Sequence, residues 1–298
     1  MIGTPDRDYN EFIKSKVRLD SRMGFRVAPE SVHPVLKEHQ RDIALWALAG
    51  GRRAIFAAFG LGKSLMQLEI MRQVARAEGG RQLIVAPLGV RQEFKRDAAG
   101  LLGMDIAFVR RDEEIDGEGL YLTNYESIRD GRLSVSHFNA ASLDEASVLR
   151  SYGSDTFQSF MALFPSVKYR FVATATPSPN RYKELIHYAG FLGIMDTGQA
   201  LTRFFQRDST KANNLTLYPH KEREFWLWVN SWAIFLQKPS DLGYSDEGYV
   251  LPKLHVHYHR VAAGSKPGCD KRGQFKLVND AALSLTDASR EKRDSLPA

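Results

Sequence analysis

The feature that most constrains this chain is AIFAAFGLGKSL, residues 54–65. A short apolar run leads into a loop with two glycines, and the loop leads into MQLEIMRQVARA, whose apolar residues recur at helical spacing. A strand followed by a tight loop and a helix is typical of α/β folds, in which parallel strands carry ligands at their carboxyl ends. The stretch therefore predicts a parallel sheet with a ligand-binding loop after this strand.

The loop has the composition of a phosphate-binding loop. AAFGLGKS, residues 57–64, matches that pattern, with Ala57 where the pattern usually has Gly. In such loops backbone N–H groups surround the phosphates, a Lys reaches the β and γ oxygens, and a hydroxyl ligates Mg²⁺. Gly60 and Gly62 allow close approach of the backbone, and the helix that follows directs its positive end at the anion. A glycine-rich turn before a helix is the alternative, but the position between strand and helix favours nucleotide binding. The predicted nucleotide-binding residues are Ala58, Phe59, Gly60, Leu61, Gly62, Lys63, Ser64 and Leu65.

Alternation of apolar runs with amphipathic stretches continues to about residue 195. The predicted strands are AIFAAF, QLIVAP, MDIAFV, GLYLTN and YRFVAT, and the predicted helices are MQLEIMRQVARA, VRQEFKRDAAG and RYKELIHYAGFLG. This order predicts an α/β fold in which helices cover both faces of a parallel sheet.

The pattern changes after residue 195. FWLWVNSWAIFLQ, residues 225–237, has large apolar residues at helical spacing and predicts a buried helix; it is too short to span a bilayer and contains Asn230. KPSDLGYSDEGYVLP is rich in turn residues, and KLHVHYHRVA alternates like a strand. That strand would place His255, His257 and His259 on one face, where an exposed strand face is favoured over a metal site. The tail from residue 263 is polar.

An acidic pair lies in SLDEASVL, residues 142–149. At the end of a strand, Asp144 could hold Mg²⁺ and Glu145 could orient an attacking water. The alternative is a helix N-cap at Asp144, and the phosphate loop upstream favours the metal site.

Two threonines follow the strand in VATATPSPN, residues 172–180. The hydroxyls of Thr174 and Thr176 could contact the acidic pair and respond to the nucleotide. A hydroxyl-capped turn before a helix is the alternative.

The composition limits the partners and kinds of site that the chain can have. The net charge of +6 and pI of about 9.3 permit a polyanionic partner without requiring one. Cys269 is the single cysteine, which excludes an intrachain disulfide and a cysteine-based zinc site and fits a cytoplasmic setting. MIGTPDRDYNEFIKSK has no apolar core, so we expect neither a signal peptide nor a membrane partner.

Together these motifs resemble motifs I, II and III of superfamily 2 helicases and translocases, specifically the Swi/Snf-like DEAD/DEAH-box branch of phage and prophage genomes. The resemblance rests on LDEAS and TATP, in this order behind the phosphate loop, and covers roughly residues 35–195. ATPSPNRYKELIHYAGFLGIM and KPSDLGYSDEGYVLP resemble the phage group in particular. It implies a RecA-like domain that binds ATP and Mg²⁺ and acts on nucleic acid, with DNA the expected kind, in a bacterial or phage-infected cell.

The resemblance also implies residue roles. Gln40 in LKEHQRDIALWAL would read the adenine edge; Lys63 and Ser64 would contact phosphate and Mg²⁺. Asp144 and Glu145 would take the metal and water roles.

For nucleic acid, the resemblance points to two loops, APLGV at residues 86–90 and TNYES at residues 123–127. Phosphate contacts would fall to Arg91 and Asn124, and a sugar or base contact to Tyr125. Thr174 and Thr176 would couple ATP state to nucleic-acid contact.

The sequence departs from the family pattern in two places. NAASL before the acidic pair is less apolar than a buried strand, and no stretch of residues 199–298 matches the Q-x-x-G-R-x-x-R motif that supplies an arginine finger. We therefore expect a first RecA-like domain at residues 1–198 (core 35–198), a helical insertion or linker at 199–262 and a polar tail at 263–298 leading to a missing second domain. Loss of an arginine finger costs about 10³ to 10⁵ in rate, so we expect ATP binding with little hydrolysis unless a partner or missing segment supplies that domain.

Three functions remain open from the sequence. The first is an ATP-dependent helicase or translocase motor domain. The second is a nucleotide-gated module that binds DNA or a partner without turnover. The third, a phosphate-loop kinase or small-molecule ATPase, leaves TATPSPN and the adenine-like segment unexplained.

Overall fold

The computed structural model describes residues 23–150, 153–178, 181–207, 215–250 and 253–258. The chain divides into two compact units, Met1–Val250 and Leu251–Ala298. In the second unit the described residues, 253–258, form neither helix nor strand, and His255 and His257 are exposed there. The predicted strand KLHVHYHRVA is therefore wrong for these residues, because alternation alone makes no strand without a pairing partner; His259 lies outside the described residues.

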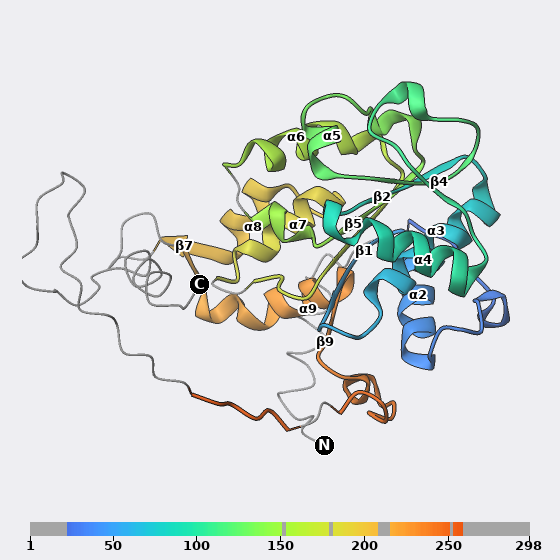
Figure 1. The fold of residues 1–298 in the computed structure, drawn as a ribbon. Helices are drawn as coiled ribbons and strands as arrows, with labels where there is room; N and C mark the ends of the chain where they lie inside the picture. The colour runs from blue at the N-terminus through green and yellow to red at the C-terminus, as the bar shows by residue number, and fades with distance from the viewer. Residues whose placement is uncertain (1–22, 151–152, 179–180, 208–214, 251–252, 259–298) are drawn as a thin grey trace, which may run out of the picture. The chain divides into compact units, whose positions relative to one another are not determined.

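A seven-stranded sheet forms the centre of the first unit (Figure 1). Its order is β3-β4-β2-β5-β6-β1-β9, and every neighbouring pair is parallel. The strands are β1 (Arg52–Ala57), β2 (Arg81–Val85), β3 (Ile106–Phe108), β4 (Gly119–Thr123), β5 (Ala140–Asp144), β6 (Tyr169–Thr174) and β9 (Ala233–Leu236). The predicted parallel sheet is confirmed. AASLD also forms a strand of it, and all five of its residues are buried although this stretch is less apolar than the other strands.

Helices cover both faces of this sheet (Figure 1). One face packs against α2 (Glu38–Gly50), α3 (Lys63–Glu78) and α4 (Arg91–Leu102). The other packs against α5 (Tyr125–Arg129), α6 (Asp155–Leu163), α7 (Glu184–Leu192), α8 (Thr197–Phe204) and α9 (Glu222–Trp232). A short antiparallel hairpin, β7 (Phe205–Arg207) with β8 (Leu215–Leu217), follows α8.

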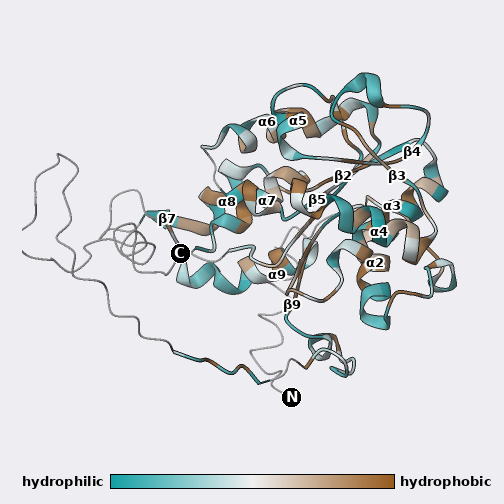
Figure 2. Ribbon diagram, in the orientation of Figure 1, coloured by the Kyte–Doolittle hydropathy of each residue, from teal (hydrophilic) through white to brown (hydrophobic). Residues whose placement is uncertain are grey.

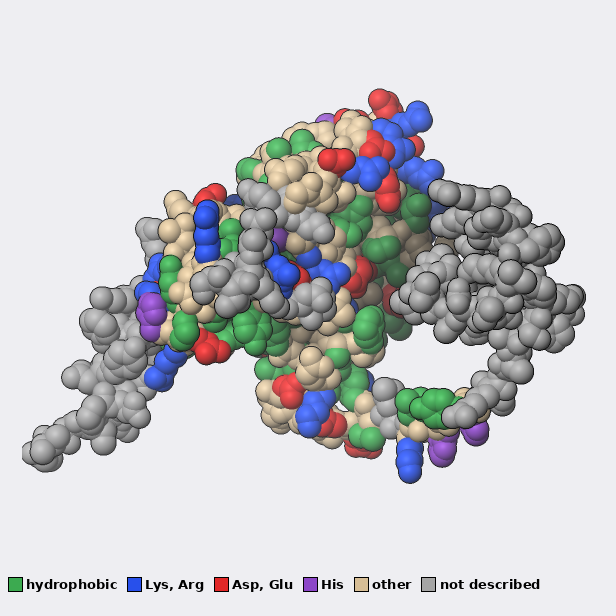
Figure 3. Space-filling view, turned by 90° about the vertical axis from the view of Figure 1, so that its left-hand side faces the viewer, with side chains coloured by type: hydrophobic (Ala, Val, Ile, Leu, Met, Phe, Trp, Pro, Cys, Tyr) green, Lys and Arg blue, Asp and Glu red, His purple; other side chains and the backbone are tan. Residues whose placement is uncertain are grey.

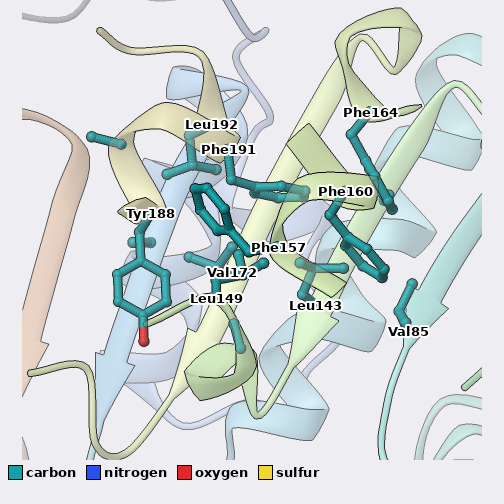
Figure 4. Packing of buried hydrophobic residues seen from close by; sticks show 14 of the residues in the cluster. Val85, Leu143, Leu149, Phe157, Phe160, Phe164, Val172, Tyr188, Phe191 and Leu192 are labelled. Carbon is teal, nitrogen blue, oxygen red and sulfur yellow. The ribbon is translucent and has the colours of Figure 1, made fainter. Parts of the chain in front are cut away.

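Strand side chains alternate between two hydrophobic cores. In β1, Ile55 faces the α2–α4 core, whereas Ala54 and Phe56 face the other. Figure 2 shows apolar residues concentrated on the strands and on the inward sides of the helices. Figure 4 shows rings from α6 and α7 beside Leu143 of β5 and Val172 of β6. Packing on both sides explains why strands of a parallel sheet are apolar along most of their length.

The stretch FWLWVNSWAIFLQ differs from its prediction as one helix. Helix α9 ends at Trp232, and the next four residues form β9, which pairs with β1 at the edge of the sheet. The sheet therefore takes a strand from residues 233–236, and the compact unit continues past residue 198 to Val250. In the described part of the chain, no helix has the length and apolar character to cross a membrane.

Candidate nucleotide-binding site

Three motifs that are far apart in the sequence meet at one edge of the sheet. Strands β5, β6 and β1 are parallel neighbours, so their carboxyl ends lie side by side. Phe56 of β1 is paired with Thr174 of β6, and Asp144 of β5 with Ala173 of β6. The phosphate loop, the acidic pair and the two threonines therefore surround one place, where open α/β sheets bind ligands.

The loop between β1 and α3 has the backbone that a phosphate cradle requires. Gly60 and Gly62 both have left-handed φ angles, 81° and 78°. A Cβ on Gly62 would lie 2.4 Å from the side-chain nitrogen of Gln40, whereas one on Gly60 would meet nothing within 4 Å. The space above Gly60 is thus open, and Gly62 is needed for both its φ angle and its close contact.

Two hydrogen bonds hold this loop in place. The backbone N–H of Ala58 donates to the carbonyl of Leu236 at 2.8 Å, so strand β9, which the sequence pattern did not predict, supports the first residue of the loop. The Gln40 amide donates to the carbonyl of Leu61 at 3.1 Å.

Lys63 begins α3 and folds back over the loop. Its Nζ donates to the carbonyls of Ala57 and Ala58 at 2.9 and 3.1 Å and lies 5.3 Å from the ring centre of the exposed Phe59. Burial lowers the pKa of Lys63, while the charges of Asp144 and Glu145 oppose that shift. The ammonium group therefore lies within electrostatic reach of the acidic pair.

Asp144 is the last residue of β5 and is 8% exposed. Its Oδ1 accepts a 2.8 Å hydrogen bond from Gln67, and its carbonyl accepts one of 2.6 Å from the hydroxyl of Tyr125. Burial raises the pKa of Asp144, and the Gln67 hydrogen bond acts in the opposite direction. Both the side chain and the main chain of Asp144 are therefore fixed from neighbouring elements.

Glu145 has a φ of 47°, the one positive φ of a non-glycine residue in the described segments. Such a conformation costs about 1–3 kcal/mol and persists where the surroundings impose it. The Thr174 hydroxyl donates to Glu145 Oε1 at 3.2 Å, and Thr174 Oγ1 accepts from the backbone N–H of Thr176 at 3.1 Å. The structure thus brings Thr174 to the acidic pair, while Thr176 reaches it through its backbone and leaves its own side chain exposed.

The residues present fit Mg²⁺ bound together with a nucleotide. Mg²⁺ takes oxygen ligands and is usually held by one or two protein groups plus phosphates and waters. Ser64, in the first turn of α3, and Asp144 are the residues that could hold it. Among the described residues no group of three His, Cys, Asp or Glu side chains could hold a metal ion.

Gln40, the residue predicted to read the adenine edge, bonds within the protein through both ends of its amide. Its side chain is 5% exposed, its Oε1 accepts from the backbone N–H of Lys37 at 3.0 Å, and its Nε2 is bound to Leu61. Both ends of the amide are engaged, so in this structure Gln40 braces the loop against α2. Reading an adenine edge would require these bonds to be exchanged.

The three predicted nucleic-acid residues do not form one exposed surface. Arg91 is half-buried, with its guanidinium 4.7 Å from the ring centre of Phe108. Asn124 and Tyr125 are 5% and 7% exposed, and their polar groups bond within the protein. Burial therefore argues against direct contacts of Asn124 and Tyr125 with nucleic acid.

On the face drawn in Figure 3, Lys and Arg side chains lie beside Asp and Glu side chains, so this face carries charges of both signs.

Two residues of the site gave no sequence signal. Gln67 and Ser142 are each 0% exposed and are joined to Asp144 through hydrogen bonds. A glutamine in an amphipathic helix and a serine in a strand match no motif, and only the packing of α3 on β5 brings them together.

Comparison with known proteins agrees with this geometry at the level of fold. No family model matches the sequence, and no curated protein matches it either. Among solved structures, the SWI2/SNF2 ATPase core of Sulfolobus solfataricus in complex with dsDNA has a TM-score of 0.57 over 71% of this chain and 46% of its own, at 19% identity. This chain shares the fold of part of a SWI2/SNF2 ATPase core. It spans less than half of that core's length.

Two further structures score lower. The SWI2/SNF2 ATPase core domain of Sulfolobus solfataricus has a TM-score of 0.49 at 16% identity, over 72% of this chain and 47% of its own. The UvsW helicase of bacteriophage T4 has a TM-score of 0.44 at 15% identity, over 64% of this chain and 65% of its own. The assignment to the SWI2/SNF2 fold rests on the first structure alone.

Proposed function

We propose that this chain is the ATP-binding domain of a nucleic-acid-dependent ATPase, a helicase or translocase acting on DNA. The observation that carries the proposal is the convergence of Lys63, Asp144 and Glu145 at the carboxyl ends of β1 and β5, on either side of β6, whose Thr174 holds Glu145. A phosphate loop alone serves many enzymes. A phosphate loop beside an acidic pair whose second member is bonded to the next strand is suited to ATP hydrolysis linked to movement.

Each residue has a distinct task in this proposal. The loop N–H groups and Lys63 bind the phosphates, and Lys63 exchanges the carbonyls of Ala57 and Ala58 for phosphate oxygens. Mg²⁺, when bound, neutralises charge on the β and γ phosphates. Glu145 orients the attacking water and accepts its proton, and the Thr174 hydrogen bond holds that carboxylate in place.

Thr174 also connects this chemistry to the rest of the molecule. It shares its hydroxyl between Glu145 and the backbone of Thr176, and the carbonyl of Thr176 accepts a 3.4 Å hydrogen bond from Arg150. A change at Glu145 on hydrolysis would shift this exposed segment. We propose this as the route by which nucleotide state alters nucleic-acid contact.

The proposed motor needs a second RecA-like domain to supply an arginine to the γ-phosphate, provided by a partner or by another segment. No stretch of residues 199–298 carries the expected arginine motif. Without that arginine the rate falls by about 10³ to 10⁵, so the chain alone should bind ATP and hydrolyse it weakly. This also supports the second candidate, a nucleotide-gated module that binds DNA or a partner without turnover.

The ATPase rate with and without duplex DNA tests the proposal, with Lys63→Ala as the inactive control. A fluorescent-nucleotide titration on the same samples separates binding from turnover. DNA-stimulated turnover that Lys63→Ala abolishes supports the motor and implies an arginine supplied in trans. Binding without turnover, with DNA affinity that changes between ATP and ADP, supports the gated module. Absence of nucleotide binding would contradict both.

A further inference from the structure

Gln67 lies one helical turn after Lys63, on the face of α3 that packs against β5. It is completely buried and makes two short hydrogen bonds across the helix–sheet interface. Its Nε2 donates to Asp144 Oδ1 at 2.8 Å, and its Oε1 accepts from the Ser142 hydroxyl at 2.7 Å. Ser142 stands two residues before Asp144 and so faces the same side of β5.

The chemistry of these partners fixes the orientation of the amide. An ionised carboxylate only accepts hydrogen bonds, so the NH₂ end of Gln67 must face Asp144. The oxygen end then faces Ser142, whose hydroxyl can rotate to donate. Reversing the amide would set its oxygen against the carboxylate in a buried site, at a large electrostatic cost. Ser142 therefore reinforces the one amide orientation that holds Asp144.

We propose that Gln67, oriented by Ser142, is a positioning residue that holds the Asp144 carboxylate for Mg²⁺ binding. The inference rests on the proposed function, because it assigns Asp144 to the metal that accompanies ATP. Without Gln67, a carboxylate at the end of a strand could populate several rotamers and would lose conformational entropy on binding the metal. Holding it in one rotamer beforehand reduces that entropic cost of metal binding. Lys63 and Gln67 then serve different parts of the ligand from successive turns of one helix.

The test measures nucleotide affinity and its response to Mg²⁺ separately. Fluorescent mant-ADP is titrated onto the full chain, first in EDTA and then at increasing Mg²⁺. Gln67→Met keeps an unbranched side chain of similar size but removes both hydrogen bonds. Gln73→Met is the matched control: Gln73 lies on the same helix, is 4% exposed and makes two comparable bonds, to the carbonyl of Ser31 and to Glu69.

Loss of a group that orients a metal ligand typically weakens metal affinity about 10- to 100-fold. We expect Gln67→Met to raise the Mg²⁺ concentration for half-maximal tightening of mant-ADP by at least about tenfold, with affinity in EDTA close to wild type. Gln73→Met should leave both unchanged. A Mg²⁺ response of Gln67→Met like that of wild type would overturn the inference, as would equal losses with and without Mg²⁺.

If Gln67→Met lacks a cooperative thermal transition, Ser142→Ala tests the proposed role of Gln67 instead. That variant removes one hydroxyl and leaves Gln67 in place, so we expect a smaller increase in the Mg²⁺ requirement at unchanged affinity in EDTA. An unchanged Mg²⁺ requirement would overturn the inference. Failure of the proposed function has a different signature, since the wild-type chain itself would then bind no mant-ADP.

Discussion

Glu145 has a strained backbone conformation and is held there by neighbouring residues. Its left-handed backbone is unusual for a residue with a long side chain, and it follows directly on Asp144, whose carbonyl is held by Tyr125. The conformation directs the two carboxylates of adjacent residues to different partners, Gln67 for Asp144 and Thr174 for Glu145. A residue that tolerates a cost of about 1–3 kcal/mol in this position is suited to a functional role more than to a structural one.

Glu145→Gln separates these roles. Glutamine has the same shape and can still accept from Thr174, so Mg²⁺–nucleotide affinity should stay within about twofold of wild type. In any preparation that hydrolyses ATP, turnover should fall about 10²- to 10⁴-fold because the water loses its base. Fluorescent-nucleotide titration and a phosphate-release assay measure the two effects, with the exposed Glu113→Gln as control. Loss of nucleotide binding would show instead that Glu145 is structural.

Tyr125→Phe tests the support under the acidic pair. It removes the buried hydroxyl that donates to the carbonyl of Asp144, and should lower the free energy of unfolding by about 1 kcal/mol. Urea denaturation measures this, and Tyr182→Phe, on a ring that is 48% exposed, should change nothing. Equal stability of Tyr125→Phe and wild type would mean that this hydrogen bond does not hold the strand end.

At the scale of elements, α7 is tied to the segment after the acidic pair by a buried histidine. His187 donates from Nδ1 to the carbonyl of Arg150 at 2.8 Å, at the end of the 3-10 helix Ala146–Arg150. Burial lowers the pKa of His187, and its hydrogen bonds to backbone carbonyls oppose that shift. The folded protein therefore holds this imidazole neutral at pH values where the unfolded chain begins to protonate it.

This difference sets the sign of a pH effect. The pKa of His187 in the folded protein is below the unfolded value of about 6.5. The contribution of neutral His187 to the free energy of unfolding is therefore complete above that pH and is lost as the pH falls below it. The free energy of unfolding should thus decrease from pH 7 to 5, with His187 contributing at most about 1.4 kcal/mol per pH unit. His187→Asn should make the free energy of unfolding depend less on pH. The contribution of His39 would remain, because burial lowers the pKa of that residue as well. Urea denaturation across this range measures the slopes; the exposed His220→Asn is the control, and identical slopes for His187→Asn and wild type would contradict the account.

The α9–β9 pair shows that the compact unit does not end at residue 198. Phe225, Trp228 and Trp232 are at most 1% exposed, and β9 covers the edge of β1 and supports Ala58. Loss of a buried aromatic side chain costs about 3–5 kcal/mol, so losing three exceeds the stability of most domains. We expect a chain of residues 1–198 to lack a cooperative thermal transition, and one of residues 1–250 to melt like the full chain. Circular dichroism measures both, and a folded 1–198 fragment would contradict this boundary.

For the whole molecule, the sequence predicts the parts whose signals are local. The loop from Ala57 to Ser64 and the acidic pair are recognised from their residue types and spacing. Most of the buried strands have continuous apolar runs, so the linear pattern places them along the chain as well; β5, with Ser142 and Asp144, has no such run and is located by its acidic pair. The linear pattern is not enough for β9, because four apolar residues after a helix continue its pattern equally well. Gln67, and the brace from Tyr125 to Asp144, depend on which faces of α3, α5 and β5 meet. Such contacts have no linear signature.

The ATP site itself is tested most directly by a calorimetric titration of ATP with Mg²⁺ into the full chain and into Lys63→Ala. Lys63 offers charged hydrogen bonds to the phosphates, each contributing about 1.5–3 kcal/mol. We predict one ATP bound per wild-type chain, and binding weakened by roughly 10- to 150-fold in Lys63→Ala. Equal affinities for the two proteins, or no heat of binding for wild type, would contradict the claim that the convergence of Lys63, Asp144 and Glu145 forms an ATP site.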